Sequence, residues 1–409
     1  MKLLFLVPHF APDVAPTGDV ATRIVSELAA RGHSIEVLTA LPWYRLHKIE
    51  PEYSGKLVRR EDTPWGSITR LHPFPSSDKQ NIPRRALSYA GFTALSSWVG
   101  SRGPDVDAVL ALSPPLTLGL AGRRVAKARN APFVFNIQDV FPDIAVELGA
   151  LTNKRLIGAA LKLEKFCYER ADAITVLSDD LKDNVVAKLG ISEKVHVIPN
   201  FVDTEWITPM ERENAYRAEY GLTDKTVVMY AGNVGLSQSL DMVLEAAGAL
   251  AYETDVVFVI NGQGAKRDEL ERHARGLANV RFVDMQPSHR LPELLAAADI
   301  HLVPLKRGLA RSSVPSKTYS ILAAGRPLVA SVDPGSEVAR LIERSGAGVS
   351  IPPEDSEALT KTLRQMIDSP DELEVMGRSG RSFIEGWASP RAVAEAYEEL
   401  FLSLGVRAK

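Results

Sequence analysis

The feature that most constrains the fold is an alternation between short apolar runs and longer segments with helical periodicity. Because each run is apolar along its whole length, we expect strands covered on both faces, as in a parallel sheet flanked by helices. The pattern predicts an α/β fold with two doubly wound Rossmann-like domains. The predicted strands are 3–7, 35–39, 108–112, 133–137, 173–177 and 195–198, then 227–231, 256–260, 280–283, 300–305, 328–331 and 348–351.

A length of 409 residues is typical of two domains. The boundary is predicted within 199–224, which is polar and has no strand pattern, giving domains at 1–200 and 201–388.

The single cysteine, Cys167, excludes an intramolecular disulfide and a cysteine-rich metal site, and it favours a reducing, cytoplasmic compartment. Pro8 stops the first apolar run, so we interpret that run as a strand rather than a signal peptide. No run of about 18 apolar residues predicts a transmembrane helix.

A polar loop ending in Pro-Ser-Lys opens a short predicted helix. Pro315 and Ser316 are typical of a helix start, and Gly325 is typical of a helix end. Lys317 then lies in the first turn, where free N–H groups and the positive end of the helix dipole favour an anion. A phosphate or diphosphate is the natural ligand. The alternative is a helix cap with an exposed lysine.

Glycines follow several predicted strands, at the carboxyl ends where doubly wound sheets bind ligands. None of these turns has the complete dinucleotide or P-loop spacing, and each alone also fits tight packing. Together with the Lys317 loop they favour a phosphate-bearing ligand. The glycines are Gly18, Gly232, Gly235, Gly262 and Gly264.

The net charge is −3, but residues 54–102 carry eight Lys and Arg against three Asp and Glu. Arg84 and Arg85 begin the segment 84–100, whose apolar side includes Trp98. Paired arginines beside such a segment are typical of an interfacial helix on anionic lipid. The alternatives are a solvated basic face and a helix buried against the first sheet.

Several segments are specific through their order and spacing. They include FAPDVAPTGD, ALSPPL, NIQDVFPDIAVELGAL, KVHVIPNFVD, MYAGNVGLSQSLD and VPSKTYSILAAGRPLVASVDPGSEVARLI. With these segments the chain resembles family 4 glycosyltransferases of the two-Rossmann-domain GT-B fold, nearly end to end. The resemblance is greatest to the bacterial transferases of colanic acid, capsule and O-antigen synthesis, including the N-acetylfucosamine transferase type.

This resemblance implies transfer of a sugar, with retention, from a nucleotide diphosphate sugar to a hydroxyl acceptor, without a metal or other cofactor. Uridine is the favoured base, guanosine the alternative, and an N-acetylamino sugar a candidate donor. The N-terminal domain would face the acceptor across a cleft from the donor domain, and residues 389–409 would form a helix crossing back to it. Similar enzymes use polyprenyl-diphosphate-linked saccharides as acceptors. The expected partners are therefore the donor, such an acceptor and the anionic inner face of the plasma membrane, and not nucleic acid.

The chain departs from the family pattern at the donor residues. The two family glutamates fall on Ser312 and Ser320, and the nearest downstream acidic residue is Glu337. Glu337 would face the donor's ribose or would only stabilise a helix start. Asn233 and Gln238 replace the family's Arg and Lys, which shifts neutralisation of the diphosphate toward Lys317.

Other positions are implied by the same alignment. The donor's base should stack on 283–289, which includes Met285 and Gln286. Asp139, near the position of the family's histidine, would orient the acceptor hydroxyl or balance charge on the sugar, or would cap the turn before Pro142. His9, in the turn after the first strand, would be a loop histidine or an acceptor contact.

Two other functions are compatible with the sequence. One is a sugar-nucleotide epimerase on the same fold, which would consume a UDP-sugar without an acceptor. The other is a non-catalytic sugar-nucleotide-binding scaffold subunit, suggested by the missing glutamate pair.

Overall fold

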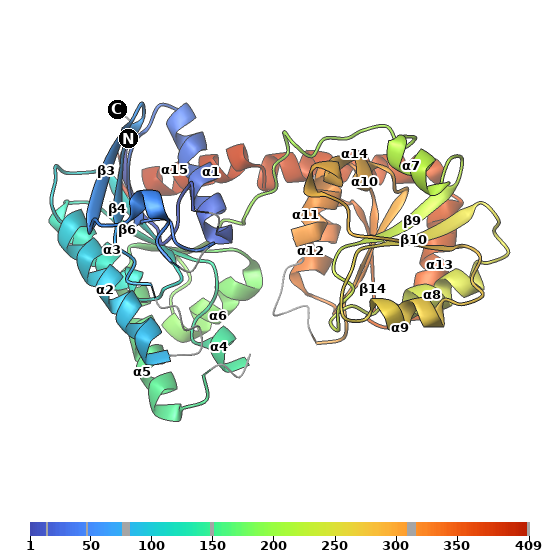
Figure 1. The fold of residues 1–409 in the computed structure, drawn as a ribbon, viewed down its shortest axis with the longest axis horizontal. Coiled ribbons are helices and arrows are strands. Elements are labelled where there is room, and N and C mark those ends of the chain that lie inside the picture. Colours follow the sequence, from blue (N-terminus) through green and yellow to red (C-terminus); the bar gives the residue numbers. More distant parts are fainter. Residues whose placement is uncertain (14, 46–47, 76–81, 148–150, 309–315, 407–409) are drawn as a thin grey trace. The chain divides into compact units, whose positions relative to one another are not determined.

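The computed structural model describes residues 1–13, 15–45, 48–75, 82–147, 151–308 and 316–406. The chain forms two compact units (Figure 1). Unit 1 consists of Met1–Asn200 together with Pro390–Lys409, and unit 2 of Phe201–Ser389. Each unit contains one mainly parallel sheet covered by helices.

Unit 1 is built on an eight-stranded sheet with the order β3-β4-β2-β1-β5-β6-β7-β8. Every pairing is parallel except that of β3 with β4. The inner strands β1, β5 and β6 are buried almost throughout, which accounts for their uninterrupted apolar sequence. The strands are β1 (Lys2–Leu6), β2 (Ser34–Ala40), β3 (Val58–Thr63), β4 (Gly66–Leu71), β5 (Ala108–Ser113), β6 (Phe133–Ile137), β7 (Ala173–Val176) and β8 (Val195–Val197).

Seven helices belong to unit 1 in the described part of the chain, and the last of them comes from the C-terminal segment. That helix, α15, packs on α1, where Arg31 pairs with Glu395 at 2.9 Å and with Glu398 at 2.5 Å. The helices are α1 (Pro16–Ala30), α2 (Ile82–Gly100), α3 (Leu118–Ala128), α4 (Asp143–Glu147), α5 (Lys154–Arg170), α6 (Asp179–Leu189) and α15 (Pro390–Ser403).

Unit 2 contains a six-stranded parallel sheet with the order β11-β10-β9-β12-β13-β14. Side chains alternate between two cores: Val227 and Met229 of β9 face one, and Val228 and Tyr230 face the other. The strands are β9 (Thr226–Ala231), β10 (Val256–Asn261), β11 (Val280–Val283), β12 (Ile300–Pro304), β13 (Leu328–Ser331) and β14 (Gly348–Ile351). The helices are α7 (Ala215–Tyr220), α8 (Asp241–Ala249), α9 (Arg267–His273), α10 (Leu291–Ala296), α11 (Ser316–Ala323), α12 (Glu337–Ser345), α13 (Ser356–Ile367) and α14 (Pro370–Trp387).

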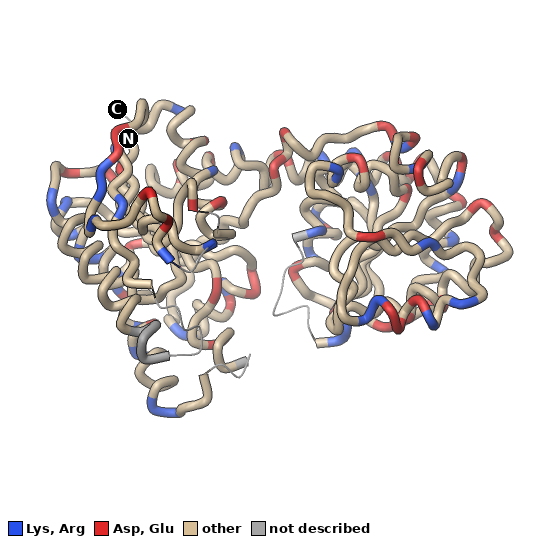
Figure 2. Tube along the Cα trace, viewed as in Figure 1, with Lys and Arg blue, Asp and Glu red and all other residues tan. Residues whose placement is uncertain are grey.

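These sheets confirm the predicted fold class, and all twelve predicted strands are present. The β3–β4 hairpin was not predicted. Its edge strand, VRREDT, alternates exposed and half-buried residues and has no apolar run. Charged side chains on such an edge discourage pairing with another chain. Part of the basic stretch is neutralised here, because buried Arg70 pairs with Glu61 at 3.0 Å. Figure 2 shows basic and acidic positions close together along this hairpin.

Candidate functional site

The carboxyl ends of β9, β10 and β11 are joined by main-chain hydrogen bonds. The Gly232 N–H donates to the Asn261 carbonyl at 2.9 Å, and the Gly262 N–H donates to the Val283 carbonyl at 2.9 Å. The turns that follow these strands therefore form one continuous surface, at the edge where doubly wound sheets bind ligands.

Two predicted glycines are required by close backbone contacts in this surface. Gly262 has φ +146°, and a Cβ there would lie 1.8 Å from the Gly232 carbonyl oxygen. Gly264 has φ +156°, and a Cβ there would lie 2.3 Å from the Val234 carbonyl oxygen. Any side chain at either position would separate the turns, so we interpret these glycines as part of the site's construction.

Lys317 lies beside the first of these turns. It is the second residue of α11, and its Nζ donates to the Tyr230 hydroxyl at 3.0 Å and lies 4.2 Å from the centre of the Tyr230 ring. A Cβ on Gly232 would lie 3.0 Å from the same Nζ. The structure thus brings together Lys317 and Gly232, which are 85 positions apart in the sequence.

The electrostatic state of Lys317 is unusual. Burial lowers the pKa of its ammonium group to about 8. Among the described residues no carboxylate pairs with it, and the Tyr230 hydroxyl, its acceptor, itself donates to the Asn233 carbonyl at 2.5 Å. A desolvated ammonium without a counter-ion gains most from a bound anion.

Sequence reasoning missed two residues of this surface. Tyr230 lies in an apolar strand segment and therefore resembles a core residue. Its place two positions before the turn glycine Gly232 could have marked it as part of the site. Arg267 donates to the carbonyls of Gly262 and Val283, the latter at 3.0 Å, and pairs with Glu271 at 2.5 Å. It therefore ties the β10 and β11 turns together.

The predicted Asn233 and Gln238 shape the turn after β9. The Gln238 Oε1 accepts from the Gly235 N–H at 3.1 Å, and its Nε2 donates to Ser237. A Cβ on Gly264 would lie 2.7 Å from the Asn233 Oδ1, so Asn233 packs against the next turn. Both side chains are neutral, and neither supplies a positive charge to a ligand.

The remaining predicted donor residues lie farther along the same sheet. Met285 is exposed just after β11, whereas Gln286 is held by hydrogen bonds with Tyr220 at 3.1 Å and Arg290 at 2.9 Å. Ser320 is half-buried on α11. Ser312 and the side chain of Ser316 lie outside the described residues.

Glu337 is buried at the first position of α12. Its carboxylate accepts a hydrogen bond from Arg340 of the same helix at 2.8 Å. The side chain thus stabilises its helix start, and a contact with the donor's ribose stays a prediction.

In unit 1, His9 and Asp139 line one pocket of about 550 Å³, together with Trp43, Tyr44 and Phe92 among others. The surrounding pocket wall partly desolvates the Asp139 carboxyl group and raises its pKa. No described residue donates a recorded hydrogen bond to that carboxyl group, so the capping interpretation finds no support in its contacts. A Cβ on Gly18, on α1, would lie 3.0 Å from the Cβ of His9.

Helix α2 buries Phe92, Thr93 and Ser96 but exposes two large apolar side chains. Leu87 is 73% exposed and Trp98 is 57% exposed. The guanidinium of Arg102 lies 3.7 Å from the centre of the Trp98 ring. The side chains of Arg84 and Arg85 lie outside the described residues.

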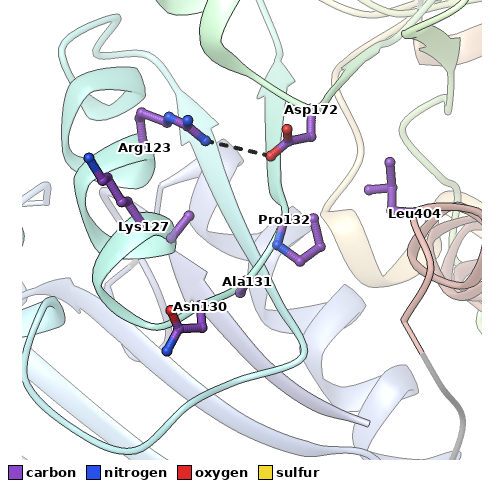
Figure 3. A pocket seen from close by; sticks show the side chains of 8 residues that line it. Arg123, Lys127, Asn130, Ala131, Pro132, Asp172 and Leu404 are labelled. Atoms are coloured by element: carbon purple, nitrogen blue, oxygen red, sulfur yellow. Dashed lines mark ion pairs between the residues drawn. The ribbon is translucent and has the colours of Figure 1, made fainter.

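A further pocket of about 490 Å³ lies at the amino ends of β6 and β7, and its lining includes Arg123, Lys127, Asn130 and Asp172 (Figure 3). Arg123 pairs with Asp172 at 3.8 Å. Ligands of parallel sheets bind at the opposite edge, so we do not assign this pocket to the functional site. Within the described ranges, no three His, Cys, Asp or Glu side chains group as metal ligands would.

Comparisons with known proteins concern the family and the fold of the chain. Residues 18–206 match the family profile described as Glycosyltransferase Family 4, and residues 225–369 match the profile described as Glycosyl transferases group 1. The chain is 31% identical over 380 residues to the putative colanic acid biosynthesis glycosyl transferase WcaI of Escherichia coli, covering 90% of this chain and 92% of that protein.

Solved structures of similar fold include a sucrose-phosphate synthase and a protein bound to UDP. Sucrose-phosphate synthase from Thermosynechococcus elongatus superposes with a TM-score of 0.67 at 17% identity, covering 99% of each chain. Anabaena Alr3699/HepE in complex with UDP gives a TM-score of 0.66 at 15% identity, covering 98% of this chain and 100% of that one. At these identities the likeness concerns the fold.

Proposed function

Because the chain belongs to glycosyltransferase family 4, we propose that it transfers a sugar, with retention, from a UDP-sugar to a hydroxyl of a lipid-linked saccharide. The observation that carries this proposal is the half-buried Lys317, which donates to Tyr230 beside Gly232. Its position at the carboxyl ends of the strands suits the diphosphate of a nucleotide sugar.

The mechanism follows from where charge develops. As the sugar leaves, negative charge accumulates on the terminal phosphate of the nucleotide. Lys317 is a fixed donor that stabilises this charge without reorganising, together with those main-chain N–H groups of the turns after β9 and β10 that do not already donate within the sheet. We propose that they replace the divalent cation that other sugar transferases use, so that the reaction needs no metal.

The choice of uridine and of the acceptor draws on relatives. HepE, of the same fold, is described in complex with UDP, and WcaI is named for colanic acid biosynthesis. We propose a role in the synthesis of a cell-surface polysaccharide, with an N-acetylamino sugar as the favoured donor.

The first prediction tests the identity of the donor nucleotide and the independence of the reaction from a metal. UDP, and to a smaller degree GDP, should raise the melting temperature of the protein, and a panel of UDP-sugars should contain one that is transferred to a polyprenyl-diphosphate-linked saccharide. Excess EDTA should leave the rate within about twofold, since fixed cationic donors supply the electrostatic stabilisation. Loss of activity with EDTA, restored by Mg²⁺ or Mn²⁺, would contradict the metal-free mechanism. Failure of every nucleoside diphosphate to bind would contradict the proposal as a whole.

Membrane contact is proposed for α2. No helix in the described parts of the chain has the length and apolarity to cross a bilayer. However, the exposed Leu87 and Trp98 lie on one side of α2, with Arg102 against the indole. Apolar side chains beside cations favour the surface of an anionic bilayer, and we propose peripheral attachment at the inner face of the plasma membrane.

The second prediction concerns this attachment. Changing Arg84 and Arg85 to Glu should weaken binding to vesicles of anionic phospholipid by roughly 10-fold to 100-fold, at about 1 kcal/mol for each basic residue near the surface. Sedimentation with vesicles measures the effect. The matched control reverses Arg123 and Arg124 on α3, which should change binding little. Equal sedimentation of both double variants with the wild type would refute the role of α2.

A further inference from the structure

The hydrogen bonds around Lys317 leave its amine able to react. The Nζ donates to the Tyr230 hydroxyl at 3.0 Å, and that hydroxyl donates its own proton to the Asn233 carbonyl at 2.5 Å. Burial raises the pKa of the Tyr230 phenol, so the hydroxyl stays protonated and keeps this direction. Because Tyr230 only accepts from Lys317, the lone pair of a neutral amine is not used in this hydrogen bond.

The surroundings of Lys317 also favour the neutral amine. Within the part of the chain that the structure describes, no carboxylate pairs with Lys317, whereas Lys225 of the same unit pairs with Asp255 at 2.8 Å. Both lysines are half-buried. Since burial lowers the pKa of the Lys317 ammonium to about 8, roughly a quarter of this amine is neutral at about pH 7.5. A neutral, desolvated lysine is a nucleophile suited to covalent chemistry.

Under the proposed function, a phosphate group binds beside this amine. An electrophile that carries a phosphate of its own would be held in the same place, with its reactive atom next to Nζ. Acyl phosphates meet this requirement, because their carbonyl carbon is bonded directly to a phosphate oxygen and phosphate is a good leaving group. Holding the two reactants together in this way raises the rate of a bimolecular step. A neutral acyl donor lacks the phosphate and gains nothing from the site.

We infer that Lys317 is a modification site, at which the amine takes the acyl group of an acyl phosphate bound in the place proposed for the donor's diphosphate. The inference rests on the proposed function for the position of that phosphate. In the step, a bond forms between Nζ and the carbonyl carbon, and the bond from that carbon to the phosphate oxygen breaks. Inorganic phosphate leaves with the electron pair, and the proton displaced from the nitrogen passes to water.

Acylation would close the donor site. The product is a neutral amide, which no longer neutralises the charge of a diphosphate. The acyl group also needs room beside Gly232, where a Cβ alone would lie 3.0 Å from Nζ. The modified protein should therefore keep its fold but lose both UDP binding and sugar transfer, so that acyl phosphates would regulate the enzyme.

The reaction is measured by incubating the protein with acetyl phosphate at about pH 7.5 and quantifying acetylated peptides by mass spectrometry. Relative to an ordinary lysine, the neutral fraction of Lys317 is larger by about two powers of ten, and the lower basicity takes back about one, as it does for thiols. Lys317 should therefore react at least about 10-fold faster than Lys225, the matched control. Equal rates at the two lysines would refute the inference.

A neutral acyl donor, p-nitrophenyl acetate, separates guidance by the phosphate from the reactivity of the amine. With this reagent the preference for Lys317 over Lys225 should be at least about threefold smaller than with acetyl phosphate. The same preference with both reagents would show that no phosphate is held beside the amine, and the inference would be wrong.

Protection by UDP links the modification to the donor site. UDP at about 10 times its Kd should slow acetylation of Lys317 about 10-fold by occupying the site, and it should leave Lys225 unchanged. If UDP raises the melting temperature but does not protect Lys317, the acyl phosphate is not held where the diphosphate binds. The inference then fails, although the proposed function stands. If UDP does not bind to the unmodified protein, it is the proposed function that has failed, and the two rate comparisons still decide the inference.

Discussion

Replacing Lys317 with methionine should abolish stabilisation by UDP and lower the rate of sugar transfer by about 10²-fold to 10³-fold, the usual effect of removing one preorganised donor from a transition-state charge. The unliganded variant should be more stable than the wild type, on the order of 1–2 kcal/mol, because the wild type holds a desolvated ammonium whose pKa is lowered to about 8. Thermal melts with and without UDP measure both effects. Opposite changes in stability and activity would identify Lys317 as a functional group rather than a structural one.

Lys306→Met is the matched control. Lys306 is a half-buried lysine just after β12, and its N–H donates to the Ser237 carbonyl. The Lys306→Met variant should bind UDP as the wild type does. If Lys317→Met keeps full stabilisation by UDP, the diphosphate lies elsewhere and the proposed donor site is wrong.

The lowered pKa of Lys317 also predicts how the affinity for UDP and the stability of the unliganded protein depend on pH. A bound diphosphate favours the charged ammonium, so it raises that pKa, and binding above pH 8 requires uptake of a proton. The affinity of the wild-type protein for UDP should therefore fall as the pH rises from about 8 to 9.5. The stability of the unliganded protein should respond in the opposite sense. Its folded state binds this proton less tightly than the unfolded chain, whose lysine keeps the ordinary value of 10.5, so stability rises between the two values.

The sequence predicted the parallel strands well because they are apolar throughout. It failed at the β3–β4 hairpin, whose charged edge strand contains no such run. The same limit applies to Tyr230, which sits in the apolar pattern of β9 and therefore passes for a core residue. The role of Tyr230 depends on a hydrogen bond from Lys317, which is distant in the sequence, to the Tyr230 hydroxyl. Contacts of this kind are set by packing between elements, and the tyrosine two positions before the turn glycine is their only local trace here.

The candidate site was predictable where a residue type is rare at its position. Glycines after strands and a lysine at a helix start stand out on physical grounds, and the structure places Gly232 and Lys317 together. The pairing of His9 with Asp13 was within reach, since the two are four positions apart. The burial of Asp13 could not be predicted from the sequence, because the N–H groups that donate to its carboxylate come from Trp43 and Tyr44, which are distant in the chain.

Gly262→Ala should destabilise unit 2 by roughly 3 kcal/mol or more and abolish UDP binding. Two costs combine at this position. The backbone has φ +146°, which is strained for any residue with a Cβ. In addition, the new methyl group would lie 1.8 Å from the Gly232 carbonyl oxygen, so the turns after β9 and β10 must separate. Chemical denaturation and UDP melts measure the two consequences.

Gly276→Ala separates the backbone cost from the contact. Gly276, between α9 and β11, has φ +95°, but nothing lies within 4 Å of the position its Cβ would take. This variant should lose only about 1 kcal/mol and bind UDP normally. If Gly262→Ala loses no more than Gly276→Ala, the two turns tolerate separation and the glycine contact is not what builds the site. A large loss at Gly262 alone, with UDP binding lost below the melting temperature, would show that the diphosphate surface depends on the approach of one main chain to another. In that case Lys317 could bind the diphosphate only where Gly262 lets the turns after β9 and β10 come together.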